Sequence, residues 1–339
     1  MSGPDRATQM TKLYEIIGGY HATQLLEVGR ALGVWEAIAE SPSITSDGLS
    51  AQLGTDRFYT DVLLRTAFAF ELIDRDGDGW RMAAHFDEIL GRPDATFYLG
   101  NVARIHLLLG RDYEDYATRF RDGSLFSFQA HDREFIEAVA DGLKTLPRIF
   151  SEVVLPKLPA LRAKLERGGT LLDVGCGGGW ALVTFAERFP KLRCIGVDIE
   201  RRSIDMANAL LRERGLADRC EARLLGVEGL TERDAYDVAT TFLVVHELEP
   251  RIKPAVFEAV ARSLKPGGSF VIFDETYPET EEALRTMPSR FAALAQWFEL
   301  TWGNRVDTRT ALLKLLADAG LAVAEETMLS RFTIIVATK

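Results

Sequence analysis

Residues 171–179 read LLDVGCGGG and join an apolar run to the start of an amphipathic stretch. Glycine lets the backbone turn sharply and approach a ligand closely, and the first turn of a following helix offers unpaired N–H groups. The spacing Gly175-x-Gly177-x-Gly179 places Trp180 where the dinucleotide-binding fingerprint has a small residue. The bulky indole therefore argues against NAD as the ligand of this loop.

Two acidic residues accompany the glycine loop. Asp173 comes just before the glycines, where it could meet a cationic group. Asp198 ends the next apolar run, where a carboxylate can hold both hydroxyls of a ribose. The pattern predicts a nucleoside-containing ligand; a glycine turn in a ligand-free α/β domain is the alternative.

From Thr170 onward, short apolar runs alternate with amphipathic helices, which is typical of a parallel sheet covered on both faces. Strands are expected over residues 170–174, 193–198, 221–225, 237–242 and 269–274. Helices are expected over residues 180–189, 202–214, 254–264 and 310–319. Two last strands, 321–329 and 332–338, are joined tightly at Ser330-Arg331 and should therefore be antiparallel.

The first third of the chain is predicted to be helical. Apolar residues recur near helical spacing at Leu25, Leu26, Val28, Leu32, Val34, Trp35 and Ile38. Turn and cap residues at 43–46 precede a short segment over 47–53, and a second helix is expected over 57–72. Extended pieces around Ile73 and 80–82 flank the turn sequence DGDG at 76–79. Helix, turn, helix and hairpin follow one another as in a winged helix.

The charge of this segment argues against DNA binding. Residues 41–90 hold four basic residues against nine acidic ones, a net charge of −5, and the whole chain has a formal charge of −10. Nucleic acids and anionic lipids attract positive charge, and a recognition helix needs Arg or Lys. We therefore expect no nucleic-acid or membrane partner, and a packing or dimerisation role for this segment, so that the protein is a homodimer.

The composition suits a cytoplasmic protein of about two domains. Its 339 residues are long for one domain. Three scattered cysteines, Cys176, Cys194 and Cys220, are too few for a disulfide framework or zinc cluster, so reduced thiols and no metal are expected. No apolar run approaches the about 20 residues of a membrane span, and residues 1–12 lack the apolar core of a signal peptide.

The glycine loop and Asp198 resemble the first two motifs of class I S-adenosylmethionine-dependent methyltransferases. In that family the loop wraps the methionine portion of the cofactor and the acid after the second strand binds the ribose. The resemblance implies S-adenosylmethionine as cofactor and a Rossmann-like, seven-stranded α/β sheet with an antiparallel last hairpin. The cofactor-binding residues that it implies are Asp173, Gly175, Cys176, Gly177, Asp198, Ile199, Val227 and Phe242.

One position departs from that family. An acid often follows the glycine that ends the third strand and contacts the adenine amino group. Here Val227 occupies that place and Glu228 comes one residue later. Backbone groups and apolar contacts are therefore expected to hold the adenine.

From about Leu25 to Lys339 the chain resembles the small-molecule O-methyltransferases, in which a winged-helix domain dimerises and helps to close the partner's substrate pocket. His246 matches the family's catalytic histidine, with Glu247 replacing the usual aspartate. Asp274 matches the acid that orients the histidine. The resemblance implies that His246 deprotonates an acceptor hydroxyl; a packing histidine is the alternative. A further family carboxylate, expected near Val306 and Asp307, is not clearly matched.

These observations predict three segments: a winged-helix-like dimerisation domain at 1–93, a helical linker and pocket roof at 94–168, and an S-adenosylmethionine-binding catalytic domain at 169–339. The substrate-lining residues expected are His106, Phe126, Trp297 and Trp302. The predicted reaction methylates a hydroxyl of a small secondary metabolite.

Two alternatives stay open at this stage. The first is methylation of carbon or nitrogen on an indole-like acceptor or on a prenyl diphosphate held by Arg104, Arg111 and Arg119. The second is a cofactor-sensing regulator that binds DNA through its winged helix.

Overall fold

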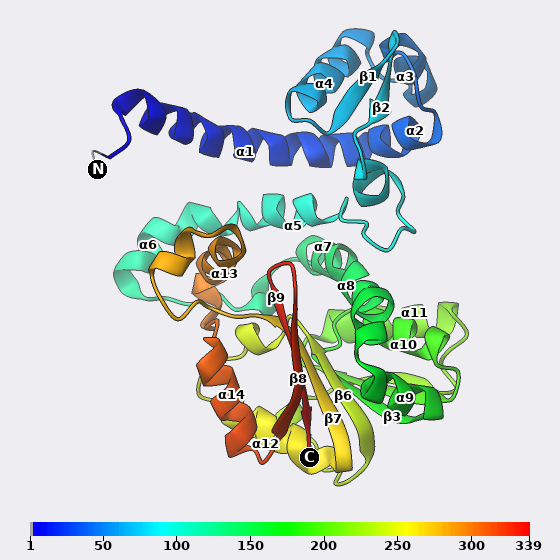
Figure 1. Ribbon diagram of the computed structural model, residues 1–339, viewed down its shortest axis with the longest axis vertical. Coiled ribbons are helices and arrows are strands. Elements are labelled where there is room, and N and C mark those ends of the chain that lie inside the picture. The colour runs from blue at the N-terminus through cyan, green and yellow to red at the C-terminus, as the bar shows by residue number, and fades with distance from the viewer. Residues whose placement is uncertain (1–2) are drawn as a thin grey trace. The chain divides into compact units, whose positions relative to one another are not determined.

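The computed structural model of the chain describes residues 3–339, which form two compact units (Figure 1). The first unit comprises the residues up to Glu114 together with Asp141–Thr145, and the second comprises Asp115–Ala140 and Leu146–Lys339. The expected segments 1–12 and 1–93 begin two residues earlier, outside the described residues. Packing defines these units, and the functional division into 1–93, 94–168 and 169–339 stays a prediction.

The first unit is mainly helical. The helical run expected over 25–38 is divided at Gly33, whose N–H bonds back to Arg30 and caps the first helix. Among its buried apolar residues are Trp35, Ile38 and Leu64. Helices followed by a hairpin occur in the predicted order, and the winged-helix assignment stays a prediction. The elements are α1 (Arg6–Leu32), α2 (Val34–Glu40), α3 (Ser46–Leu53), α4 (Arg57–Ala69), the antiparallel pair β1 (Ile73–Asp76) and β2 (Gly79–Met82), and α5 (Val102–Leu109).

The second unit is built on a seven-stranded sheet of order β5-β4-β3-β6-β7-β9-β8. Neighbouring strands from β5 to β7 are parallel, whereas β9 runs antiparallel to both β7 and β8. The predicted α/β fold, with a Rossmann-like seven-stranded sheet and an antiparallel last hairpin, is confirmed. The strands are β3 (Gly169–Val174), β4 (Leu192–Asp198), β5 (Cys220–Leu224), β6 (Tyr236–Phe242), β7 (Leu264–Glu275), β8 (Ala322–Leu329) and β9 (Phe332–Thr338).

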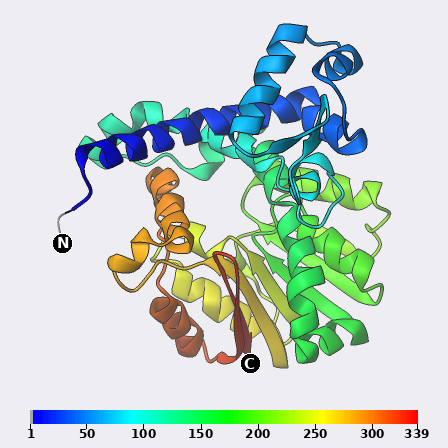
Figure 2. The ribbon, with the colours of Figure 1, turned by 45° about the horizontal axis from the view of Figure 1, so that its top comes forward.

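Helices cover both faces of this sheet. Figures 1 and 2 show α9, α10 and α11 on one side and α12 and α14 on the other. The remaining helices are α6 (Tyr116–Asp122), α7 (Arg133–Leu143), α8 (Thr145–Ile149), α9 (Pro159–Arg167), α10 (Trp180–Arg188), α11 (Arg201–Glu213), α12 (Lys253–Ser263), α13 (Met287–Phe298) and α14 (Arg309–Asp318). No helix within residues 3–339 combines the length and apolar character needed to cross a bilayer.

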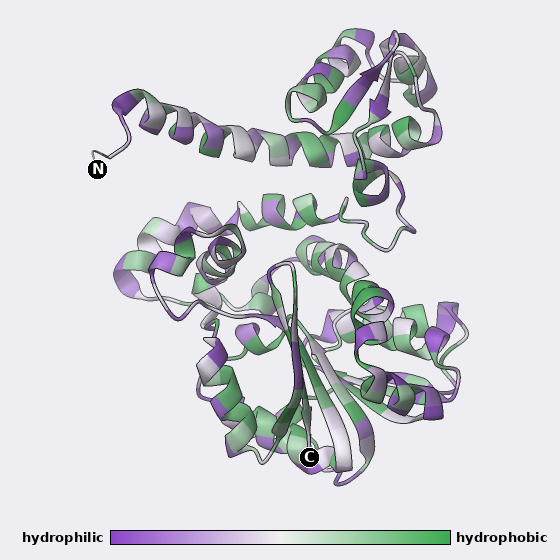
Figure 3. Cartoon of the chain, viewed as in Figure 1, coloured by the Kyte–Doolittle hydropathy of each residue, from purple (hydrophilic) through white to green (hydrophobic). Residues whose placement is uncertain are grey.

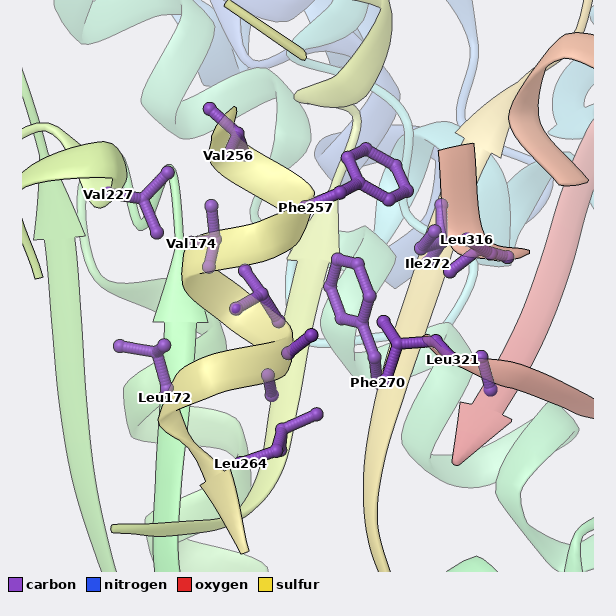
Figure 4. Packing of buried hydrophobic residues seen from close by; sticks show 14 of the residues in the cluster. Leu172, Val174, Val227, Val256, Phe257, Leu264, Phe270, Ile272, Leu316 and Leu321 are labelled. Atoms are coloured by element: carbon purple, nitrogen blue, oxygen red, sulfur yellow. The ribbon is translucent and has the colours of Figure 1, made fainter. Parts of the chain in front are cut away.

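A hydrophobic core lies between the sheet and helices α12 and α14, which carry many hydrophobic residues (Figure 3). Phe257 of α12 meets Phe270 of β7 edge to face, with ring centroids 5.7 Å apart (Figure 4). Ile272 and Leu316 pack in the same cluster and are fully buried. Full burial of each such side chain stabilises the fold by about 1.5–3 kcal/mol. The sheet therefore provides a firm base for the loops at the ends of its strands.

Candidate active site

The carboxyl ends of β3, β4 and β6 meet at one edge of the sheet, because these strands are parallel neighbours. In the sheet, β4 lies on one side of β3 and β6 lies on the other, so the strand order reverses direction at β3. Open α/β sheets bind their ligands at such a switch point. The glycine loop follows β3, Asp198 ends β4, and residues 243–246 follow β6. The topology thus brings together segments that are far apart in the sequence.

Three glycines of the loop, Gly175, Gly177 and Gly179, adopt a positive φ, which favours glycine. Gly175 has a φ of +68°, and a Cβ there would lie 2.5 Å from Cγ2 of Val244. Gly177 has a φ of +49°, yet a Cβ there would meet no atom within 4 Å. The loop therefore presents bare backbone to open space, which fits a ligand that must approach the chain closely.

Asp198 holds the loop from the neighbouring strand. Its Oδ2 accepts a 2.8 Å hydrogen bond from the N–H of Gly177, and its Oδ1 accepts one of 2.8 Å from Glu200. Burial raises the pKa of Asp198, and the two N–H donors oppose that rise. A carboxylate can accept about four hydrogen bonds, so both oxygens keep capacity for ribose hydroxyls. Ribose binding by Asp198 stays a prediction.

Asp173 lies within β3 and is only 2% exposed. It accepts a 2.7 Å hydrogen bond from the hydroxyl of Thr240 on β6, and burial raises its pKa to about 7. This placement makes it a brace between the two strands that carry the site loops. The expected direct meeting with a cationic ligand stays a prediction.

The other predicted cofactor residues are apolar or weakly polar. Cys176 and Val227 are buried, whereas Ile199 is 62% exposed beside the end of β4. Phe242 packs edge to face on Phe150, with ring centroids 5.7 Å apart. These side chains offer apolar contact of the kind expected for an adenine, and their role stays a prediction.

His246 and Asp274 meet, as expected from the ends of β6 and β7. His246 Nδ1 donates to Asp274 Oδ1 over 2.5 Å, and Asp274 Oδ2 accepts a 2.8 Å bond from the N–H of Val245. His246 is 5% exposed and Asp274 is 1% exposed. The carboxylate fixes the imidazole ring and directs its other nitrogen, Nε2, away from β7.

A second carboxylate, Glu299, faces that nitrogen. Its Oε1 lies 3.5 Å from His246 Nε2, and its Oε2 accepts a 2.7 Å hydrogen bond from Asn304 Nδ2. Burial alone would lower the pKa of His246, but the charges of Asp274 and Glu299 together hold that pKa well above its ordinary value. The imidazole therefore lies between two buried acids.

Sequence reasoning did not single out Glu299. The position considered for a further carboxylate was near Val306 and Asp307, and Asp307 binds Nζ of the buried Lys253 at 2.5 Å instead. Glu299 comes directly after α13, between Trp297 and Trp302, which the sequence did mark as expected substrate-lining residues. An acidic residue among apolar side chains is the sequence signal that could have identified Glu299.

Glu247 completes the acidic surroundings of the histidine. Burial raises its pKa to about 8, and the charge of Glu299 adds to that rise. One potential ligand atom each of His246, Glu247 and Glu299 lies within 4.8 Å of the others, a spacing that could hold a divalent cation. A metal-free site stays a prediction.

An aromatic cluster connects two segments of the second unit. It comprises Phe126, Phe128, His131, Phe135 and Trp302. His131 stacks on Phe135 with centroids 4.0 Å apart, and Trp302 stands edge-on to His131 at 5.5 Å. The N–H of Phe126 donates to the carbonyl of Thr301 over 2.8 Å. The cluster thus joins residues 126–135 to the segment that follows α13.

The aromatic cluster contains two of the four residues predicted to line the substrate, Phe126 and Trp302. Trp297 is 46% exposed and packs instead on Tyr116, with centroids 5.4 Å apart. His106 belongs to α5 in the first unit. Substrate contact by all four stays a prediction.

Arg202 of α11 connects the aromatic cluster to the edge that carries Asp198. Its guanidinium donates to the carbonyls of His131, over 2.6 Å, and Gln129, over 3.0 Å. Glu200, two residues after Asp198, holds the same guanidinium at 2.7 Å. Arg202 therefore links the segment that follows Asp198 to the backbone of residues 129–131 through hydrogen bonds.

Comparison with known proteins agrees with this geometry. Residues 146–326, more than half of the chain, match the family described as "Methyltransferase domain". The mitomycin biosynthesis 6-O-methyltransferase of Streptomyces lavendulae is 26% identical over 286 residues, covering 82% of this chain and 81% of that protein.

Two solved structures share the fold over the whole chain. An O-methyltransferase family protein from Burkholderia thailandensis has a TM-score of 0.73 and 20% identity over 99% of both chains. Human N-acetylserotonin methyltransferase, solved in complex with SAM, has a TM-score of 0.73 and 17% identity over 100% of this chain and 99% of its own. These structural similarities establish the fold. The match of residues 146–326 shows that the chain belongs to the methyltransferase domain family.

Proposed function

We propose that this methyltransferase takes its methyl group from S-adenosylmethionine and transfers it to a hydroxyl of a small secondary metabolite. The observation that carries the choice of a hydroxyl is the buried pair of His246 Nδ1 and Asp274 Oδ1, 2.5 Å apart at the ligand-binding edge of the sheet. The Streptomyces relative, an O-methyltransferase by name, supports the same choice.

The donor site is proposed at the glycine loop and Asp198. The open face at Gly177 suits close backbone contact, and the spare capacity of Asp198 suits two ribose hydroxyls. S-adenosylmethionine supplies an electrophilic methyl group on a sulfonium when bound. The protein then has to exclude water and to align a nucleophile with that group.

His246 is proposed to supply the proton acceptor. A phenol has a pKa of about 10 and is a poor nucleophile at neutral pH, so it gains from a positioned base. Asp274 holds the proton on Nδ1, which leaves the lone pair on Nε2 to take the proton of the acceptor hydroxyl. The oxygen would gain the methyl group as the bond from that carbon to the sulfonium sulfur breaks, which leaves a neutral thioether, and the proton would remain on an imidazolium that lies between Asp274 and Glu299.

The other readings have weaker support. Arg104 pairs with Glu27 at 3.0 Å and Arg119 with Asp115 at 3.5 Å, so these guanidinium groups already have anionic partners. This disfavours a prenyl diphosphate as acceptor. A regulator that only senses the cofactor has no need of a buried histidine between two acids.

We further propose that the protein is a cytoplasmic homodimer assembled through its first unit. Helix α1 exposes large apolar side chains along its length. The net negative charge of residues 41–90 disfavours DNA binding. These exposed residues are Met10, Leu13, Tyr14, Ile16, Ile17 and Tyr20.

The test is methyl transfer from isotopically labelled S-adenosylmethionine to phenols and to a small-molecule extract, by the wild-type protein and by His246→Gln. We expect the label in a methyl ether and a loss of about 10²- to 10⁴-fold in the single-turnover rate for the variant. Label in a carbon- or nitrogen-bound methyl group would contradict the proposed acceptor. A variant within about tenfold of wild type would mean that alignment alone drives the reaction.

A further inference from the structure

A short segment of the second unit, residues 126–131, has hydrogen bonds at both of its ends, and we call it the strap. The N–H of its first residue, Phe126, donates to the carbonyl of Thr301 over 2.8 Å. The carbonyl of its last residue, His131, accepts a 2.6 Å hydrogen bond from the guanidinium of Arg202. The strap therefore joins two parts of the second unit that are far apart in the sequence.

The two anchors of the strap adjoin the two halves of the proposed active site. Thr301 comes two residues after Glu299, whose Oε1 lies 3.5 Å from Nε2 of His246 on the acceptor side. Arg202 comes four residues after Asp198 on the donor side. Six residues span at most about 20 Å, so the strap limits the distance between the two sides. Transfer requires reacting atoms about 3–3.5 Å apart, so the reaction depends on that distance.

The guanidinium of Arg202 uses all three of its nitrogens at its anchor. Nη1 donates to the carbonyl of His131, Nη2 donates to that of Gln129 over 3.0 Å, and Nε donates to Oε1 of Glu200 over 2.7 Å. The planar fork of an arginine donates in several fixed directions at once, and hydrogen bonds from a charged donor are about twice as strong as neutral ones. A shorter or uncharged side chain could not hold the strap in the same way.

Glu200 connects this anchor to the residue proposed to bind the ribose. It is 5% exposed, and its carboxylate pairs with Arg202. Its backbone N–H donates to Oδ1 of Asp198 over 2.8 Å. An unbroken series of hydrogen bonds therefore runs from Asp198 through Glu200 and Arg202 to the strap.

Ring packing strengthens the anchor on the acceptor side. Phe128 and His131 of the strap stand edge-on to Trp302, with ring centroids 5.3 and 5.5 Å away. The backbone N–H of Trp302 donates to the carbonyl of Glu299 over 2.9 Å. The strap therefore packs directly on the turn that carries Glu299.

We propose that Arg202 is a positioning residue for methyl transfer, which acts through the strap to fix the acceptor side of the site relative to the donor side. The inference rests on the proposed function, because it takes Asp198 as the donor side and His246 as the acceptor side. It gives a specific expectation. A ligand bound at Asp198 should restrain the strap, and it should do so only while Arg202 is present.

Amide hydrogen exchange of the strap tests this expectation without any acceptor. The amides of Phe126 and Ala130 donate hydrogen bonds, so their exchange reports how firmly the strap is held. In wild type, S-adenosylhomocysteine should slow this exchange. In Arg202→Gln the exchange should be about 10-fold faster, as for lost hydrogen bonds to a charged group, and the ligand should no longer slow it. Arg201→Gln, at the exposed neighbouring residue, is the control and should behave as wild type.

Calorimetry on the same three proteins gives the affinity for S-adenosylhomocysteine, which all three should bind because Asp198 and the glycine loop are unchanged. Bound ligand that leaves strap exchange unaltered in wild type, or slows it equally in Arg202→Gln, would overturn the inference. Failure of wild type to bind the ligand would instead contradict the proposed donor site. Equal strap exchange in ligand-free wild type and Arg202→Gln would then decide against Arg202 as an anchor.

Single-turnover methyl transfer separates positioning from a merely structural role. With saturating S-adenosylmethionine and phenol as the acceptor probe, Arg202→Gln should lose about 10- to 100-fold in rate, as for a reacting group displaced by about 1 Å. Circular dichroism should show that the variant is folded. A lower melting temperature with an unchanged rate would reject the positioning role. Absence of methyl transfer by wild type, with strap exchange as expected, would contradict the proposed function and leave the anchoring by Arg202 standing.

Discussion

Burial and two carboxylates act in opposite directions on the proton of His246. Burial favours the neutral imidazole, whereas Asp274 and Glu299 favour the charged one and prevail, so the pKa of His246 lies well above 6.5. A proton acceptor must be neutral before it acts. The rate of methyl transfer to a hydroxyl should therefore rise with pH through a midpoint above 6.5.

Glu299→Gln tests which charge sets that midpoint. Removal of one of the two carboxylates should lower the pKa of His246, so the rise in rate should occur at lower pH than in wild type. Single-turnover rates across the pH range measure the midpoint, and Glu282→Gln, an exposed change elsewhere in the same unit, is the control. An unmoved midpoint in Glu299→Gln would show that Glu299 does not act on the histidine.

Asp198 is predicted to bind the ribose of S-adenosylmethionine. Asp198→Ala should lose two hydrogen bonds to a charged acceptor and weaken binding by roughly 2 to 4 kcal/mol. Calorimetric titration of both proteins measures the change. Because Asp198 also holds the N–H groups of Gly177 and Glu200, Asp198→Asn is the matched variant, which keeps an oxygen for one of them. Unchanged affinity in both would place the ribose elsewhere.

Strand ends account for the placement of three candidate residues, whose roles stay predictions. Asp198 ends β4, Asp274 lies near the end of β7 and His246 follows β6, so strand order alone brings them to one edge. Glu299 could not be found in this way. It follows α13, and its approach to His246 depends on how that helix packs.

At the scale of the element, most strands and helices of the second unit began and ended close to the predicted residues, because their hydrophobic patterns are strong. The helix predicted over 254–264 is one residue too long, since Leu264 already pairs with Tyr236 and begins β7. Only two members of the aromatic cluster, Phe126 and Trp302, were predicted from the sequence to line the substrate. Ring packing between residues 126–135 and Trp302 is a tertiary contact that no local period marks.

The pairing of β3 with β6 carries a pH-dependent contribution to stability. Burial raises the pKa of Asp173 from 3.8 to about 7. As the pH rises, the unfolded chain therefore releases this proton at a lower pH than the folded protein does. Stability from this group is complete below about pH 4, declines as pH rises and is lost above about pH 7. The full difference corresponds to roughly 4 kcal/mol.

Asp173→Asn isolates this contribution, because an amide cannot ionise and can still bond to Thr240. Relative to wild type, the variant should gain free energy of unfolding between about pH 4 and pH 8. Urea unfolding of both proteins across this pH range measures the difference in their free energies of unfolding. Groups that titrate alike in both proteins do not contribute to that difference. Parallel curves would show that Asp173 stays ionised in the folded state.

At the scale of the whole molecule, the first unit is predicted to serve assembly. Exposed apolar residues on α1 recur three and four positions apart, as at Leu13, Ile16, Ile17 and Tyr20, which forms a stripe along one side of the helix. These four side chains are between 46% and 65% exposed. A stripe of this kind on a soluble protein marks an interaction surface.

The full-length protein should therefore be a dimer at micromolar concentration, and Ile16→Glu combined with Tyr20→Glu should convert it to a monomer, because two charges would be buried at the contact. Light scattering measures the mass, and far-UV circular dichroism checks that both proteins keep their helices. Met328→Glu on β8, where the methionine is 61% exposed, is the matched control and should remain a dimer. A monomeric wild type would remove the assembly role of the first unit, and a dimer that survives the double substitution would place the contact away from α1.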